Sequence, residues 1–220
     1  KVPSLRFVDL RGTMEAGDPT LRVLGGLPHL RAFKHRSTVV SDAGLEALAK
    51  ATALDSLLIQ DFGISDAGGR HLAAMPELVS LEIFRCQGFG SDGVLELRSL
   101  AKLNRLMLRD LPEVGDRSLA VLAELPALKR LILHELPSVG DAGLAHLAQA
   151  GGLEVLDLWN LPKVTDASAA VIAGLSHVKD LSIRETGMTE QALDALAAMP
   201  ALESLTFKNA PVSSAVAERL

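Results

Sequence analysis

The chain has 220 residues, of which 48% are hydrophobic and 22% charged, so it has ample material for a core and is not expected to be disordered. Its net charge of −5 argues against a general nucleic-acid binder, and no apolar run approaches the roughly eighteen residues needed to cross a bilayer. The single cysteine, Cys86, excludes an internal disulfide and favours a reducing, cytoplasmic location unless a targeting segment has been removed before Lys1.

A strand-like motif, L-x-x-L-x-L, recurs along the whole chain with a few substitutions. Its alternation of inward and outward positions is typical of short β-strands. The spacing between copies is always 24 or 25 residues, which predicts a repeat architecture whose units share one continuous core. The nine copies begin at Leu5, Leu30, Leu54, Leu78, Leu103, Leu128, Leu153, Val178 and Leu202.

Between the strand motifs, a second phrase recurs from GDPTLRVL at Gly17 to SSAVAERL at Ser213. In most copies, Ser, Thr or Gly is followed by an acidic residue and then by apolar residues three or four positions apart, as in SDAGLEAL from Ser41. The short side chain caps free N–H groups and the acid favours the positive end of the helix dipole. Each period therefore predicts a strand, a turn and a short helix.

Phrases such as LPSVGDAGLAHLA from Leu136, joined to the strand motif, resemble the leucine-rich-repeat proteins. They are similar to the cysteine-containing subfamily found beside F-box modules, which also has many bacterial members. No F-box segment is visible, so a ubiquitin-ligase role does not carry over. That subfamily usually has Cys three residues after the strand motif, a position held here by Thr13, Thr38, Phe62, Cys86, Leu111, Leu136, Leu161, Thr186 and Ala210.

The resemblance implies an α/β solenoid, a curved horseshoe of about nine repeats with a parallel sheet on its concave face and helices on its convex face. We expect one such domain over residues 1–220. Because solenoids usually need polar terminal caps, the open ends indicate either a longer parent chain or end-to-end self-association.

Residues in a strand alternate sides, so if the first, fourth and sixth motif positions face the core, the third, fifth and seventh face the concave surface. This predicts that Trp159, the one tryptophan, points outward beside His134 and Arg184. Exposed apolar groups bordered by charge mark interaction sites, and Trp and Arg are enriched in binding hot spots. The predicted partner-binding residues are Trp159, His134, Arg109, Phe84, Met107, Ile132, Leu58, Arg184, Asp157, Asp110 and Glu135.

The favoured function is non-catalytic recognition of a protein or peptide on this concave face, without a membrane. Other interpretations are an apolar strip shielded by curvature, a Trp159 that merely packs over its neighbours, and a sensing or substrate-recruiting segment of a larger kinase, protease or ligase. Nucleic-acid binding is disfavoured because acids interleave the basic residues, which are Arg11, Arg36, Arg109, Arg184 and Lys208.

The sequence predicts no enzymatic activity, metal site or cofactor. The six histidines lack zinc-site spacing, and no phosphate-binding or nucleophile-elbow motif occurs. Cys86 stands at a packing position, where a nucleophilic role would need an activating base. His134 beside Asp157, Asp110 and Glu135 has the residue types for acid–base work, but charge complementarity to a partner explains the same residues with fewer assumptions.

Three local irregularities give further expectations. His35, at an inward position, predicts a core histidine with a hydrogen-bond partner. Gly69 replaces the usual helix leucine and predicts a thin spot in the core. In the fourth repeat, the strand-to-helix connection that contains FRCQGFGSDG is expected to be one residue longer than in the others. The extra residue predicts either a harmless bulge or a loop that pushes Phe84, Arg85 or Phe89 outward.

Overall fold

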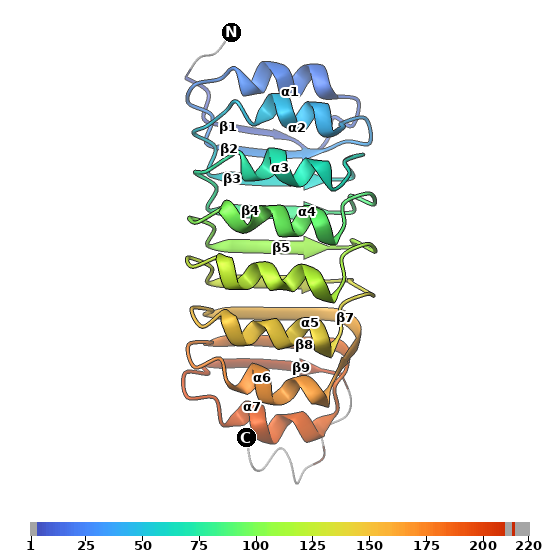
Figure 1. Cartoon of the computed structure of the whole chain (residues 1–220), viewed down its shortest axis with the longest axis vertical. Coiled ribbons are helices and arrows are strands. Elements are labelled where there is room, and N and C mark those ends of the chain that lie inside the picture. Colours follow the sequence, from blue (N-terminus) through green and yellow to red (C-terminus); the bar gives the residue numbers. More distant parts are fainter. Residues whose placement is uncertain (1–3, 210–212, 214–220) are drawn as a thin grey trace.

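The computed structural model of the protein describes residues 4–209 and residue 213. In this part of the chain, nine strands form one parallel sheet whose strand order follows the sequence. Figure 1 shows the strands stacked along the long axis of the molecule. The strands are β1 (Phe7–Leu10), β2 (Ala32–Arg36), β3 (Ser56–Gln60), β4 (Ser80–Phe84), β5 (Arg105–Arg109), β6 (Arg130–His134), β7 (Val155–Thr165), β8 (Asp180–Gly187) and β9 (Ser204–Lys208).

Short helical segments follow the strands and form one layer on a single face of the sheet (Figure 1). This alternation is the repeating unit that the helix-start phrases predict. The α-helices are α1 (Asp18–Gly25), α2 (Asp42–Leu48), α3 (Ala67–Ala73), α4 (Ser91–Leu95), α5 (Asp141–Leu144), α6 (Ala169–Ala173) and α7 (Leu193–Ala197). The 3-10 segments are η1 (Glu96–Ser99), η2 (Asp116–Glu124), η3 (Ala145–Gln149), η4 (Asp166–Ser168) and η5 (Glu190–Ala192).

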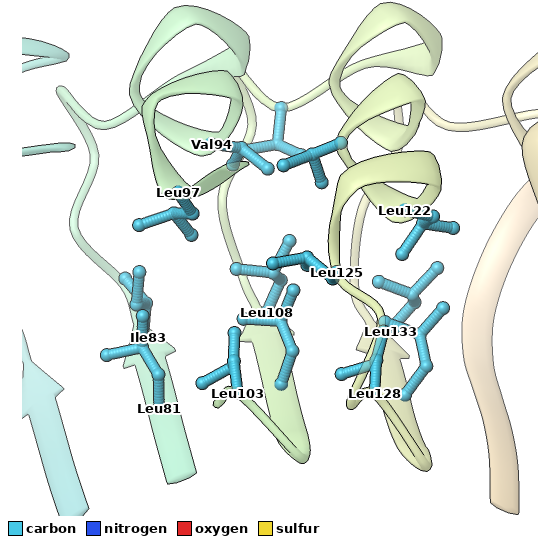
Figure 2. Packing of buried hydrophobic residues seen from close by; sticks show 14 of the residues in the cluster. Leu81, Ile83, Val94, Leu97, Leu103, Leu108, Leu122, Leu125, Leu128 and Leu133 are labelled. Atoms are coloured by element: carbon cyan, nitrogen blue, oxygen red, sulfur yellow. The ribbon is translucent and has the colours of Figure 1, made fainter. Parts of the chain in front are cut away.

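The core lies between the sheet and the helical layer. The register pairs equivalent motif positions, so Leu106, Leu131 and Leu156 lie side by side on β5, β6 and β7, each at most 1% exposed. Figure 2 shows the leucines of neighbouring repeats filling the space under the helices. The predicted solenoid and its inward positions are therefore confirmed. Ala210 lies outside the described residues, as does the last expected helix after its first residue, Ser213.

The acidic residue at the start of most helices also joins one repeat to the next. Its carboxylate accepts hydrogen bonds from the residue that caps the following helix, at distances of 2.6 to 3.1 Å. Asp92 departs from this pattern, because it pairs with Arg117 at 2.6 Å instead. The pairs that follow the pattern are Asp18 with Ser41, Asp42 with Ser65, Asp66 with Gly90, Asp116 with Gly140, Asp141 with Thr165 and Asp166 with Thr189.

Two polar groups in the core have the surroundings that the sequence predicts. His35 is fully buried, with Nδ1 3.1 Å from the carbonyl oxygen of Leu10 and Nε2 2.7 Å from that of Ala16. Cys86 is also fully buried, and its Sγ lies 3.3 Å from the carbonyl oxygen of Phe84. Burial raises the pKa of the Cys86 thiol to about 12, so the thiolate needed for nucleophilic chemistry does not form near neutral pH.

Two expectations are wrong. Gly69 does not mark a thin spot, because a Cβ there would lie 2.3 Å from the carbonyl oxygen of Gly93 and α3 and α4 pack closely at this point. The fourth repeat is not longer, because Gly90 is the N-cap of α4, at the same interval after Leu78 as Gly115 is after Leu103. Phe89 therefore points inward and is fully buried.

No described helix is both long and apolar enough to cross a membrane.

Candidate recognition surface

The candidate surface is the concave face, the side of the sheet that carries no helices (Figure 1). On β5, the inward Leu106 and Leu108 are buried, whereas Arg105, Met107 and Arg109 are partly exposed. The same alternation holds on most strands, since each keeps its core residues toward the helices. The outward positions of nine adjacent strands thus form one continuous surface.

Trp159 lies on this surface as the centre of a cluster from four strands. The imidazole of His134 meets the indole edge-on, with ring centroids 5.4 Å apart and an interplanar angle of 86°. The Cζ atoms of Arg109 and Arg184 lie 5.2 and 5.6 Å from the indole centroid. Each such cation–π contact contributes roughly 0.5–1 kcal/mol at an exposed site. Trp159 is therefore outward but partly buried, and its neighbours hold it in one orientation.

Asp157 links two members of the cluster from the adjacent outward position. Its carboxylate accepts hydrogen bonds from Nη2 of Arg184 at 3.0 and 3.2 Å, and its Oδ2 lies 3.1 Å from Nε2 of His134. Burial by itself raises the pKa of Asp157, but the nearby polar groups of His134, Arg184 and Ser182 outweigh it and lower the pKa to about 2. Asp157 is thus a fixed negative charge that orients Arg184.

His134 is only 7% exposed, where the alternation pattern predicts solvent contact. Its surroundings explain the difference, because the indole of Trp159 packs against the imidazole. Neither ring nitrogen makes a well-aligned hydrogen bond with the described residues, although Nε2 is close to Asp157. An unsatisfied buried polar group costs roughly 1–3 kcal/mol. The imidazole and carboxylate suggested by the sequence do meet, but the indole of Trp159 packs over the imidazole.

The apolar strip is narrower than the sequence predicts. Leu58 and Ile132 are each only 8% exposed, so the expectation that they face solvent is wrong. Strands in a sheet lie about 4.8 Å apart, which lets side chains on both neighbouring strands pack against an outward side chain between them. Leu58 lies between Lys34 and Glu82, and Ile132 between Met107 and Asp157. Phe84, Met107 and Trp159 keep partial exposure.

The residue after the outward seventh position forms the rim of the surface, and in the third to eighth repeats it has a left-handed backbone conformation. The φ angles lie between 49° and 61°, in a region that residues other than glycine rarely adopt. Asp61, Asp110 and Asn160 belong to residue types that favour this conformation, whereas the arginine and the two glutamates do not, so the sequence gives only a partial signal for it. The six rim residues are Asp61, Arg85, Asp110, Glu135, Asn160 and Glu185.

Ion pairs connect this rim with the strands. Asp61 accepts hydrogen bonds at 2.6 Å from both Arg36 and Arg85, and the bond from Arg85, helped by that from Arg36, lowers the pKa of Asp61 against the opposing effect of burial. Arg109 donates two bonds of 3.3 Å to Glu135. Asp110 and Glu135 line a shallow hollow together with Pro137, Asn160 and Pro162.

The structure thus brings most of the predicted binding residues together. Trp159, His134, Arg109, Arg184 and Asp157 form the central cluster. Glu135 joins it through Arg109, whereas Asp110 lies beside it on the rim. Among residues 4–209 and 213, no group of three or more His, Cys, Asp or Glu side chains is placed to hold a metal ion.

Comparison with known proteins adds a fold likeness and one sequence relative. No family model matches the chain. The Antagonist of mitotic exit network protein 1 of Eremothecium gossypii is 30% identical over 125 residues, which cover 52% of this chain and 32% of that protein. The chain therefore matches about a third of the length of this curated relative.

Three solved structures have the same fold at low sequence identity. Internalin C2 of Listeria monocytogenes has a TM-score of 0.70 and 19% identity, over 91% of this chain and 79% of that one. TLR13 in its complex with ssRNA13 has a TM-score of 0.61 and 19% identity, over 95% and 33%. Rad7 in its yeast complex with Elc1 has a TM-score of 0.54 and 16% identity, over 99% and 73%. This protein is a leucine-rich-repeat solenoid.

Proposed function

We propose that the protein is a non-catalytic recognition module that binds a protein or peptide on its concave face around Trp159. The observation that carries the proposal is the Arg109–Trp159–Arg184 arrangement. An indole and two guanidiniums are held in fixed positions on an open surface, at distances of 5.2 and 5.6 Å. Trp and Arg supply most binding hot spots, and groups fixed before binding lose less entropy when a partner arrives.

The fold likeness supports the same class of function. Rad7 was crystallised with the protein Elc1, and TLR13 with an RNA, so solenoids of this shape take macromolecular ligands. A catalytic role has less support, because His134 is covered and the Cys86 thiol is buried with a raised pKa. We also propose a cytoplasmic location, in keeping with a single reduced cysteine.

The test compares partner capture from native lysate by the wild-type protein, a Trp159→Ala variant and a Trp159→Ala/Arg109→Ala double variant. The matched control is Phe7→Ala, which removes an aromatic side chain that is 52% exposed on β1, at the far end of the sheet. We expect Trp159→Ala to weaken binding by about 2 kcal/mol or more, roughly thirtyfold. Its thermal unfolding should stay near that of the wild type.

Unfolding of Trp159→Ala without a separable loss of binding would show that Trp159 only packs over its neighbours. Retention of the partner by both Trp159 variants would contradict the proposed surface.

A second candidate is that this solenoid recruits substrates for a larger enzyme such as a kinase, protease or ligase. The observation that favours it is that the chain matches only 32% of the length of its curated relative. In this proposal, residues 1–220 act as one domain of a longer protein. A catalytic domain encoded in the same reading frame would support the second candidate, and its absence from the full reading frame would remove it.

A further inference from the structure

The central concave face carries several arginines in a chain of net charge −5. On β5 to β8, the third, fifth and seventh motif positions hold four arginines and two aspartates. One of the aspartates, Asp157, is engaged by Arg184 and His134. The arginines are Arg105, Arg109, Arg130 and Arg184, and the aspartates are Asp157 and Asp180. Ion pairs with Glu82, Glu135 and Asp157 engage Arg105, Arg109 and Arg184, which leaves the exposed Arg130 as the arginine best placed to meet a further anion.

Two of these arginines lie directly opposite each other. Arg105 on β5 and Arg130 on β6 are register partners and both face the concave side. Glu82 reaches Arg105 at 3.2 Å, whereas the exposed Arg130 interacts with Glu154 through its charge, and Glu154 makes its ion pair with Lys129. Like charges directly opposite each other on neighbouring strands are destabilising. An anion bound between the two guanidiniums would relieve this repulsion.

A pair of apolar side chains lies next to the arginine pair. Met107 and Ile132 follow two residues later on the same strands and are also register partners. Arg109 and His134 come two residues after them, against Trp159. Two residues of extended chain span about 7 Å. A peptide whose acidic side chain reaches Arg105 and Arg130 therefore places its next side chains over Met107 and toward Trp159.

We propose that Arg105 and Arg130 form a carboxylate-binding pair for an acidic side chain of an extended partner peptide, whose neighbouring apolar side chain packs on the partly exposed Met107. This inference rests on the proposed function and names the chemistry of its ligand. A guanidinium pair suits a discrete carboxylate, since Arg binds carboxylates with two parallel hydrogen bonds. The acidic rim residues Asp110, Glu135 and Glu185 would repel a continuous phosphate chain, which favours a peptide over a nucleic acid.

The chain offers a built-in reporter for the test. Trp159 is the one tryptophan and the chain has no tyrosine, so near-ultraviolet fluorescence reports on this surface alone. The probes are a short peptide that alternates glutamate and leucine, the same peptide with glutamine in place of glutamate, and a short single-stranded RNA. Each is titrated into the wild-type protein, with calorimetry as a second readout.

The test variant is Arg105→Gln/Arg130→Gln, and the matched control is Arg22→Gln, which removes an exposed arginine from α1 on the convex side. We expect the glutamate peptide to change Trp159 fluorescence and to bind at least about tenfold more weakly to the double variant, which corresponds to about 1.4 kcal/mol. The glutamine peptide should bind the wild type at that same weaker level. Added salt should weaken the glutamate peptide more on the wild type than on the double variant.

Equal affinity of the glutamate peptide for wild type and double variant would overturn the inference, as would its failure to bind the wild type. RNA binding that depends on Arg105 and Arg130, in place of peptide binding, would assign the pair to a nucleic acid instead. Capture of the partner from native lysate by each variant distinguishes failure of this inference from failure of the proposed function. A partner lost with Trp159→Ala but kept by Arg105→Gln/Arg130→Gln leaves the proposed function standing and removes the inference.

Discussion

The carboxylate of Asp141 accepts two hydrogen bonds from Thr165, the residue that caps the next repeat, one from its backbone N–H at 2.9 Å and one from its hydroxyl at 2.7 Å. Ser168 donates a further hydrogen bond to the same carboxylate. Equivalent pairs join most neighbouring repeats on the helix side of the solenoid. In a chain whose repeats contact only their neighbours, each such junction contributes directly to overall stability.

Replacing Asp141 by Asn should therefore lower the stability of the protein. The amide accepts at only one atom and carries no charge, so charge-assisted bonds from Thr165 and Ser168 are lost. We expect a loss of about 1–2 kcal/mol in the free energy of unfolding, measured by urea denaturation. Asp92→Asn is the matched control, because Asp92 forms only an exposed ion pair with Arg117. Equal losses in the two variants would show that the junction bonds contribute no more than a surface charge does.

The stability of the protein should fall in acid through Asp157. Its pKa is about 2 in the folded protein, below its ordinary value of 3.8, because the opposing effect of burial is outweighed by the nearby polar groups of His134, Arg184 and Ser182. A lowered folded pKa means that the carboxylate stabilises the fold above the ordinary value and loses this effect as pH falls through the folded value. The contribution is about 2 kcal/mol at neutral pH and disappears between about pH 4 and pH 2.

The measurement is the free energy of unfolding across that pH range for the wild type and for Asp157→Asn. We expect a shallower acid slope for the variant. The control is Asp180→Asn, which removes an exposed carboxylate from the adjacent strand. A slope identical to the wild type in Asp157→Asn would mean that this carboxylate does not contribute to acid sensitivity.

For the stability of Gly69→Ala, the structure gives a prediction opposite to the one that follows from the sequence. A thin spot in the core would be filled by Gly69→Ala, and the added helix propensity would stabilise the protein. In the structure, the new Cβ would lie 2.3 Å from the backbone of Gly93, so α3 and α4 would have to separate. We expect a loss of about 1–3 kcal/mol, seen as a lower melting temperature. Gly151→Ala, where a Cβ meets nothing within 4 Å, is the control. A melting temperature above that of the wild type would restore the thin-spot interpretation.

Much of the fold follows from periodicity. The L-x-x-L-x-L motif identifies the strands, and the alternation within it separates Leu106 and Leu108 from Arg109. The helix starts follow from capping residues such as Ser41 and Thr165, whose side chains do accept the expected backbone N–H bonds. These features depend on residues close in sequence or one repeat away. The number of repeats and the face of the sheet on which each strand side chain lies can therefore be predicted from the sequence alone.

The candidate site is predictable only in outline. The sequence places Trp159, His134 and Arg184 on neighbouring strands, which the register reproduces. It does not reveal that Arg109, two strands from Trp159, reaches the indole, because that contact depends on side-chain conformation. It also gives no warning that Ile132 is nearly covered by its neighbours.

The sequence by itself determined the repeat length, the inward leucines and the side of the sheet on which Trp159 lies, because the pleat of a strand and the period of the chain leave no other arrangement. The tertiary structure decided which outward residues stay accessible. Exposure on the concave face depends on how long side chains lean across strands about 4.8 Å apart, and this buried His134 and Ile132 while leaving Arg130 exposed. It also decided that Gly69 is the point where α3 packs closely against α4, because only the packed repeats bring Gly93 against Gly69.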